Sequence, residues 1–239
     1  MITSATTVAG RLQILRGVET LLFDPTSRRE LSEREQLHPL LAAEAWIFGD
    51  EYSLTVSEAG LTGVLERHLT LLGRTDELDG VQPVTGADGR RRRVDLMLTR
   101  TIDSGTGRHD HLVVEIKQPS VVASNLELAQ IQGYAHAVAT DQQFAAANVG
   151  WDFVLVVNKI DESVKSLLTT DGMATAPRLG HTPVRVRVLE WSQVIGQARQ
   201  RLEYVRRGLE LDVTEHDGLD RLRRDHPDRL PRHLRTTGP

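Results

Sequence analysis

Hydrophobic positions along the chain recur with two different periods. Apolar side chains follow helical spacing over residues 7–22 and again over residues 61–72. Apolar and polar positions alternate over residues 94–99 and 111–117, as they do in half-buried strands. Residues 151–158 are almost continuously apolar, which is typical of a strand buried on both faces. The pattern therefore predicts helices and strands in one chain.

Capping signals locate further helices. Ser124 and Glu127 have the spacing of a capping box and predict a helix after Ser124. Ser32 and Glu35 have the same spacing, and Pro39 predicts that this second helix is kinked or begins again at the proline.

The order of these elements predicts an α/β fold, with a mixed sheet flanked by helices, an N-terminal helix and a C-terminal helix. Residues 184–189 alternate cleanly, and Ser192 is expected to cap the last helix. We expect residues 1–30 to form an amphipathic helix and linker, residues 31–211 the main domain, and residues 212–239 a polar, mobile tail.

Composition narrows the class of protein. A chain of 239 residues with 39% hydrophobic and 26% charged residues is long enough for one globular domain with appendages. The absence of cysteine excludes disulfides, thiolate catalysis and metal sites with Cys ligands. A net charge of -4 argues against a uniformly basic nucleic-acid binder. No signal peptide or membrane span is recognisable, so we expect a cytoplasmic protein that does not bind membranes.

The segment HLVVEIKQPS, residues 111–120, carries the most informative charges. Glu115 and Lys117 stand two residues apart in an apolar strand, a spacing that places both on one face. Opposite charges beside a buried strand are costly unless they are paired or functional. The structural alternative is a cross-strand salt bridge at a sheet edge.

Asp95 adds a third charged group from the neighbouring strand. If the two strands are adjacent, Asp95 and Glu115 come close enough to share a divalent cation, and two carboxylates with water suit Mg²⁺, or Mn²⁺. Lys117 would then orient or help to deprotonate an attacking water, or stabilise developing negative charge. The alternative for Asp95 is a turn or cap residue at the start of a strand.

The VDLML and VVEIK segments around these residues resemble the core of the PD-(D/E)XK nuclease superfamily, which has the restriction-endonuclease-like fold. Val94 departs from that pattern, because the motif has proline there. EREQLHPLLAAEAWIFGDEY, RRRVDLMLTR, HLVVEIKQPS and QIQGYA also occur in the order seen in Shedu-type anti-phage nuclease domains. This resemblance covers residues 31–209.

The resemblance implies a nuclease domain over residues 31–211 that hydrolyses DNA phosphodiester bonds with Mg²⁺ or Mn²⁺ in anti-phage defence. It implies a further acid on the first helix, at Glu33 or alternatively Glu35, and an auxiliary glutamine at Gln130. The implied catalytic residues are Asp95, Glu115, Lys117, Gln130 and Glu33, with Asp95 and Glu115 as metal ligands.

The expected partners are DNA, further copies of the chain in a homo-oligomer, and a separate sensing or regulatory chain. The helix at residues 7–22 and the C-terminal helix are candidate assembly surfaces because both are amphipathic. The alternative function is a catalytically silent module of the same fold that binds nucleic acid or oligomerises. RNA stays open as a substrate, because no motif reads a 2′-hydroxyl group.

Further candidates each have a structural alternative. The four arginines at 90–93 could clamp phosphate or form a solvated turn. His109 and His111 could be metal ligands or bystanders in a loop. Trp46, Phe48 and Tyr52 could stack on bases or belong to the core. Glu44 could be an extra acid of the site or a surface residue.

Overall fold

The computed structural model describes residues 5–86, 89, 91, 93–102, 108–174, 182–208 and 217–235. Contacts divide the chain into two compact units. We name them the helical unit, which is residues 1–50, 117–121 and 190–239, and the sheet unit, which is residues 51–116 and 122–189. These units cut across the boundaries expected after residues 30 and 211, because distant segments of the chain pack together.

The sheet unit contains β1 (Ser53–Gly60), α4 (Leu61–Leu71), η3 (Thr75–Gly80), β2 (Arg93–Ile102), β3 (Arg108–Ile116), β4 (Val122–Ala123), α5 (Asn125–Thr140), η4 (Gln142–Phe144), β5 (Val149–Val157), β6 (Lys159–Ile160), α6 (Glu162–Lys165), β7 (Met173–Ala174) and β8 (Val184–Glu190), whose last residue belongs to the helical unit. The helical unit contains α1 (Ala5–Phe23), α2 (Pro25–Glu30), η1 (Glu33–Leu37), α3 (His38–Ala43), η2 (Ala45–Phe48), α7 (Trp191–Gly208), α8 (Asp217–Asp225), η5 (Pro227–Arg229) and α9 (Arg232–Arg235).

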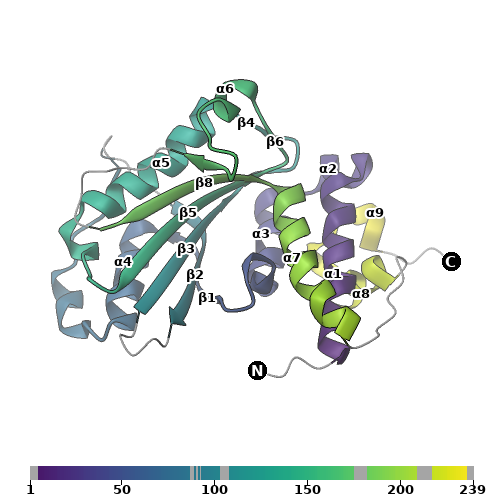
Figure 1. The fold of residues 1–239 in the computed structure, drawn as a ribbon, viewed down its shortest axis with the longest axis horizontal. Helices are drawn as coiled ribbons and strands as arrows, with labels where there is room; N and C mark the ends of the chain where they lie inside the picture. Colours follow the sequence, from purple (N-terminus) through teal and green to yellow (C-terminus); the bar gives the residue numbers. More distant parts are fainter. Residues whose placement is uncertain are drawn as a thin grey trace. The chain divides into compact units, whose positions relative to one another are not determined.

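Six strands form the main sheet in the order β1-β2-β3-β5-β8-β7 (Figure 1). β1, β2 and β3 pair antiparallel, whereas β3 and β5 run parallel and are connected through α5. A parallel pair needs such a crossover, because the chain must return to the same end of the sheet. The prediction of an α/β fold with a mixed sheet flanked by helices is confirmed. The exposed edge strand β1 lacks clean alternation and was not predicted.

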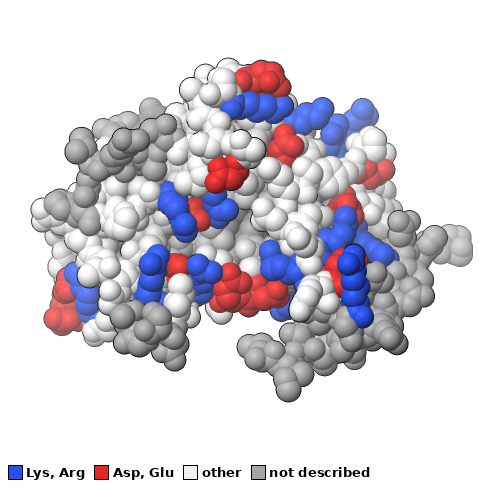
Figure 2. Space-filling view, in the orientation of Figure 1, with Lys and Arg blue, Asp and Glu red and all other residues white. Residues whose placement is uncertain are grey.

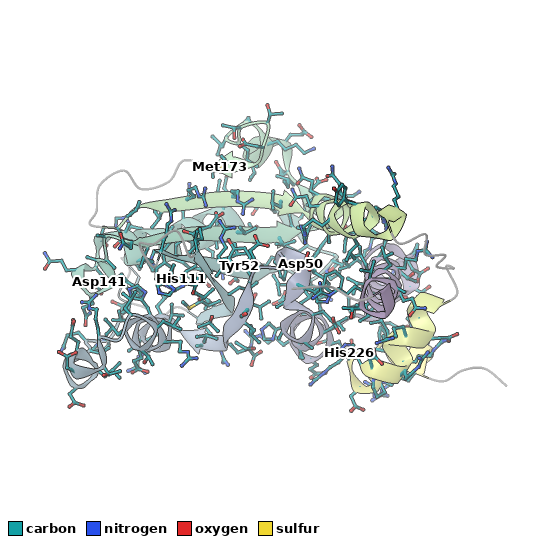
Figure 3. All side chains as sticks on the ribbon, turned by 60° about the horizontal axis from the view of Figure 1, so that its bottom comes forward. Asp50, Tyr52, His111, Asp141, Met173 and His226 are labelled. Atoms are coloured by element: carbon teal, nitrogen blue, oxygen red, sulfur yellow. The ribbon has the colours of Figure 1, made fainter. Side chains whose placement is uncertain are left out.

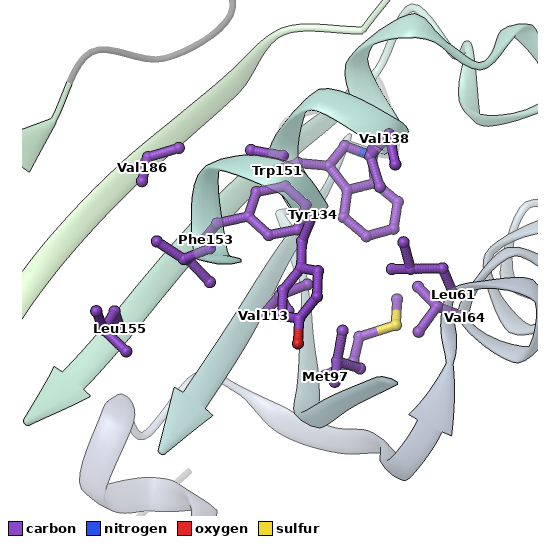
Figure 4. Packing of buried hydrophobic residues seen from close by; sticks show 14 of the residues in the cluster. Leu61, Val64, Met97, Val113, Tyr134, Val138, Trp151, Phe153, Leu155 and Val186 are labelled. Atoms are coloured by element: carbon purple, nitrogen blue, oxygen red, sulfur yellow. The ribbon is translucent and has the colours of Figure 1, made fainter. Parts of the chain in front are cut away.

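The core of the sheet unit lies between one face of the sheet and helices α4 and α5. Figure 4 shows Tyr134 and Val138 of α5 over Val113, Trp151 and Phe153 of the sheet. The capping box predicted at the start of α5 is present, with Ser124 and Glu127 each bonded to the other's backbone. It satisfies amide groups at the first turn of the helix that covers β3 and β5.

In the helical unit, α1 packs against α7 and α8. A Cβ atom at Gly17 would lie 2.5 Å from Leu222 Cδ1 and 2.8 Å from the carbonyl oxygen of Gly218, so glycine permits this close approach. Leu222 and Leu230 are fully buried. The expected polar tail therefore contains short helices within residues 217–235, which buried leucines anchor.

The apolar face of α1 is buried within the single chain. The hypothesis that this face is an assembly surface is therefore wrong, since α7 and α8 already cover it. A smaller difference concerns the start of α7. Ser192 does not cap α7, which begins one residue earlier at Trp191. None of the described helices is both long and apolar enough to cross a membrane.

Candidate active site

Asp95 and Glu115 occupy neighbouring strands near one end of the sheet. The antiparallel register of β2 and β3 pairs Leu96 with Val114, so Asp95 lies opposite Glu115 one residue farther along. Residues directly opposite in antiparallel strands have Cβ atoms about 5 Å apart and share one face. This is the face that α5 covers, since the next residues on it, Met97 and Val113, belong to the core beneath that helix. The expected juxtaposition of the two acids is present.

Hydrogen bonds orient both carboxylates. The backbone N–H of Ile116 donates to Asp95 Oδ2 at 2.7 Å. Gln130 Nε2 on α5 donates to Glu115 Oε1 at 2.6 Å and to the hydroxyl oxygen of Tyr134 at 2.7 Å. The Tyr134 hydroxyl in turn donates to the carbonyl oxygen of Arg93 at 2.8 Å. A chain of bonds therefore links α5 to both β2 and β3 beside the two acids.

The donor set suits a hard cation. Carboxylate oxygens are ligands that Mg²⁺ and Mn²⁺ accept, and Mg²⁺ commonly binds one or two carboxylates while it keeps several waters. A carboxylate has about four lone-pair positions, so the bonds from Ile116 and Gln130 are compatible with coordination. No group of three or more acidic or histidine side chains suited to a metal occurs among the described residues. The two acids therefore fit a partly hydrated ion rather than an ion enclosed by protein ligands.

The setting of Glu115 differs from the expected half-buried strand. β3 is an interior strand between β2 and β5, and its last seven residues are buried on both faces. Glu115 is 4% exposed. The alternative that places Glu115 and Lys117 at a sheet edge is therefore wrong, because β3 has neighbours on both sides.

Lys117 directly follows the last residue of β3 and belongs to the helical unit. The strand pleat ends at Ile116 and does not determine the direction of the Lys117 side chain. That Lys117 acts together with Asp95 and Glu115 stays a prediction, which rests on its place in the chain and on the resemblance.

The helix with the further acid differs in form from the expected α-helix. Residues Glu33–Leu37 form a π-helical turn that leads into α3, with Pro39 in the first turn of α3. Ser32 Oγ accepts from the N–H of Glu35 at 3.3 Å, but the Ser32 N–H donates to Gln36 Oε1 at 2.8 Å and not to Glu35. The wider π turn moves the reciprocal partner one residue along. Of the two bonds in the predicted capping box, the one to Ser32 Oγ is therefore present and the one to the Glu35 side chain is replaced.

The structure distinguishes the two candidate acids on this turn. Glu33 Oε2 accepts from the backbone N–H of Gln118 at 2.7 Å, within the helical unit. Glu35 is exposed. Glu33 is thus bonded to the residue that follows Lys117, which favours Glu33 over Glu35 as the further acid.

Of the two histidine candidates, His111 is part of the buried core, whereas His109 is half-buried with its Nδ1 3.1 Å from Thr101 Oγ1. His111 is fully buried and lies on the side of the sheet that faces the helices of its unit (Figure 3). His68 Nδ1 and His111 Nε2 are 3.0 Å apart, and His111 Nδ1 lies 2.9 Å from Thr99 Oγ1. Burial lowers the pKa of His68 to about 4 and the pKa of His111 to about 3. Both rings are neutral at pH 7, and His111 is neither a bystander nor an exposed ligand.

The remaining candidates have mainly structural settings. Trp46 is buried, and its indole N–H donates to Glu44 Oε2 at 2.6 Å. Glu44 also lies 2.6 Å from His226 Nε2, so it is not a surface residue. The guanidinium carbon of Arg100 lies 5.2 Å from the centre of the Tyr52 ring. The ring of Phe48 packs near that of Trp191. Of the run at 90–93, positions 90 and 92 lie outside the described residues, and Arg91 and Arg93 are exposed.

Three features were not predicted from the sequence. The Tyr134 hydroxyl stands one helical turn after Gln130, a spacing that indicates contact between the two side chains. The Gln118 amide as the partner of Glu33 has no sequence signal, because the residues are 85 apart. The alternation on β8 was predicted, but the bond from its Arg187 to Asp152 was not, because the two residues are 35 apart.

Comparison of the chain with protein-family models, with curated proteins and with solved structures finds no match.

Proposed function

We propose that this chain is a metal-dependent nuclease with a restriction-endonuclease-like fold that hydrolyses DNA phosphodiester bonds in anti-phage defence. The observation that carries the proposal is the pair Asp95 and Glu115, opposite each other on adjacent strands and each oriented by an amide donor. The sequence resemblance to PD-(D/E)XK nucleases and Shedu-type domains supports the same assignment, since its motifs contain these two acids.

Asp95 and Glu115 would hold Mg²⁺ or Mn²⁺. When bound, such an ion polarises a phosphoryl oxygen and lowers the pKa of a bound water. Gln130 keeps the Glu115 carboxylate in one orientation through its 2.6 Å bond, and Tyr134 holds Gln130 in place. Carboxylates that are already oriented need little rearrangement when they bind a cation, which favours tight binding.

Lys117 and Glu33 have the roles that the resemblance assigns. Lys117 would orient the attacking water, help to remove its proton or stabilise the developing negative charge. Glu33 would tune the site, and its bond to the N–H of Gln118 fixes the segment that follows Lys117. Homo-oligomerisation and a separate sensing chain stay predictions.

The test is cleavage of supercoiled and linear DNA by the purified chain with Mg²⁺, with Mn²⁺ and with EDTA, beside an RNA of the same sequence. The key variant is Lys117→Ala, and the matched control is Lys159→Ala, which removes an exposed lysine on β6. We expect metal-dependent cleavage of DNA, a loss of about 10²- to 10⁴-fold in Lys117→Ala and no loss in the control.

Cleavage that persists in EDTA, or equal cleavage by Lys117→Ala, would overturn the assigned chemistry. Preferential cleavage of RNA would correct the substrate. If wild-type protein binds DNA but cuts no nucleic acid under any of these conditions, the chain is the catalytically silent module instead.

A further inference from the structure

Four arginines lie on the face of the sheet that points away from α4 and α5. They are Arg100 on β2, Arg108 on β3, and Arg185 and Arg187 on β8. On each strand these positions alternate with residues of the core beneath the two helices, such as Met97, Val113 and Val186. Figure 2 shows basic and acidic side chains next to one another over the strands.

Two buried aspartates hold these arginines in place. Asp110, with 6% of its side chain exposed, accepts from Arg108 Nε at 2.9 Å and from Arg100 Nη2 at 2.8 Å. Asp152, with 7% exposed, accepts from Arg187 Nε at 3.2 Å and Nη2 at 2.7 Å, and Arg185 Nη2 lies 3.5 Å from it. Glu51 pairs with Arg100 at the rim. The four guanidinium groups outnumber these three carboxylates.

Arg108 and Arg185 border a cavity of about 390 Å³. Both side chains are more than half exposed, at 53% and 59%. A guanidinium has five N–H donors, more than either of these ion pairs uses. The rest of the lining is uncharged and largely apolar: Ala147, Asn148, Val149, Gly150, Trp151, Pro183 and Val184.

Gly150 leaves room for the ion pair between Asp110 and Arg108 beside this cavity. It lies opposite Asp110 in the register of β3 and β5. A Cβ atom at position 150 would come 2.7 Å from Asp110 Oδ1 and 3.2 Å from Arg108 Nη2. A larger residue would displace the aspartate that orients Arg108.

We propose that this cavity binds a nucleotide, with its phosphate between Arg108 and Arg185. Guanidinium groups match the geometry of phosphate oxygens and bind them through charge-assisted hydrogen bonds. The volume exceeds that of a single anion and lies in the range of small-molecule sites. Ala147, Pro183 and Val184 supply apolar contact for a sugar or base.

The site is distinct from the proposed cleavage site. Arg108 and Glu115 are seven residues apart on β3, which corresponds to about 23 Å, and their side chains lie on opposite faces. The nucleotide can be free in solution or the phosphorylated end of a nucleic-acid strand, because both present the same chemistry. The proposal does not depend on nuclease activity.

The test is binding to the full chain by calorimetry in EDTA, where metal-dependent cleavage cannot occur. The probes are adenosine 5′-monophosphate, adenosine, inorganic phosphate, and a short oligodeoxynucleotide with and without a 5′-phosphate. The first variant is Arg108→Gln with Arg185→Gln. It leaves Arg100 paired with Asp110 and Arg187 paired with Asp152. Its control, Arg29→Gln with Arg67→Gln, removes the same charge from exposed positions.

A second variant, Ala147→Trp, fills the cavity from an exposed position and keeps every arginine. We expect both variants to weaken binding of the phosphorylated probes about 10-fold or more, and the control pair to bind as wild type. Thermal unfolding of each variant verifies that it is folded.

Binding of the monophosphate identifies a free nucleotide as the ligand, and binding of only the 5′-phosphorylated oligonucleotide identifies a strand end. Equal binding by the variants and wild type, equal binding of adenosine and its monophosphate, or no binding of any phosphorylated probe would overturn the proposal. Because Lys117→Ala keeps the cavity intact, it must bind these probes as wild type does, whether or not wild type cuts DNA.

Discussion

Two pairs of acidic residues on the same sheet have opposite surroundings. Asp95 and Glu115 face the helices and accept hydrogen bonds from amide groups of Ile116 and Gln130. Asp110 and Asp152 lie on the other face, and each is held by two arginines. β3 carries one member of each pair, so a single strand presents both kinds of site.

The donors explain what each pair can do. An amide group orients a carboxylate but brings no net positive charge, whereas a guanidinium compensates its charge directly. Burial alone would raise the pKa of Asp110, but the bonds from Arg100 and Arg108 outweigh it and lower that pKa. The amide-bonded pair therefore suits a metal cation, and the arginine-bonded pair stabilises the sheet and presents arginines to an anion.

The largest effects should come from matched Asp→Asn substitutions in the two pairs. Asn at position 95 can still accept from the N–H of Ile116, so Asp95→Asn should keep the fold and weaken Mn²⁺ binding about 10²-fold or more, as measured by calorimetry. Asp152→Asn should keep Mn²⁺ binding and lower the free energy of unfolding by about 1–3 kcal/mol, because it leaves Arg187 without its charged partner.

Urea unfolding of both variants completes this comparison. Unchanged Mn²⁺ affinity in Asp95→Asn would place any metal site elsewhere. Unchanged stability of Asp152→Asn would show that its ion pairs contribute nothing beyond what exposed pairs do.

A smaller effect should follow from loss of the donor to Glu115. Gln130→Leu removes the N–H group that orients Glu115, and we expect metal affinity and cleavage to fall about 10- to 100-fold. Gln132→Leu is the control on the same helix, since two residues correspond to about 200° around its axis. Equal losses in both variants would indicate a general disturbance of α5 and contradict a specific role for Gln130.

A further effect on stability concerns acid, which separates Asp110 on β3 from the buried histidines, His68 on α4 and His111 on β3. The pKa values of His68 and His111, about 4 and 3, lie below the ordinary value of 6.5, so the unfolded chain binds protons first as pH falls. Stability should drop between pH 7 and pH 5 by about 1–2 kcal/mol per histidine. The ion pairs of Asp110 should stabilise the fold fully over this range. Its pKa lies below the ordinary aspartate value, so its carboxylate is protonated only under more acidic conditions.

Urea unfolding at pH 7 and pH 5 measures this drop. His68→Gln should reduce it by about half while its amide keeps contact with His111, and His136→Gln, at an exposed position, should leave it unchanged. A drop of the same size in His68→Gln would assign the acid sensitivity to other groups.

The local elements and the acid pair were predictable because their causes are local. Alternation of apolar residues marked β2, β3 and β8, and the spacing of Ser124 and Glu127 marked the start of α5. The juxtaposition of Asp95 and Glu115 followed once the two strands were taken as neighbours. Each inference used residues near one another in the sequence or one simple pairing.

Only the tertiary structure decided the features that depend on distant residues. His68 contacts His111 across 43 positions, and Arg187 contacts Asp152 across 35, so no periodicity within one segment reveals either contact. The burial of Leu222 depends on a glycine in α1, and the choice of Gln36 over Glu35 as the partner of Ser32 depends on a π turn. Spacing along the chain specifies which side chains share a face, but packing specifies what that face meets. The sequence by itself therefore determined the acids and the elements that carry them, and the fold decided which donors surround each acid.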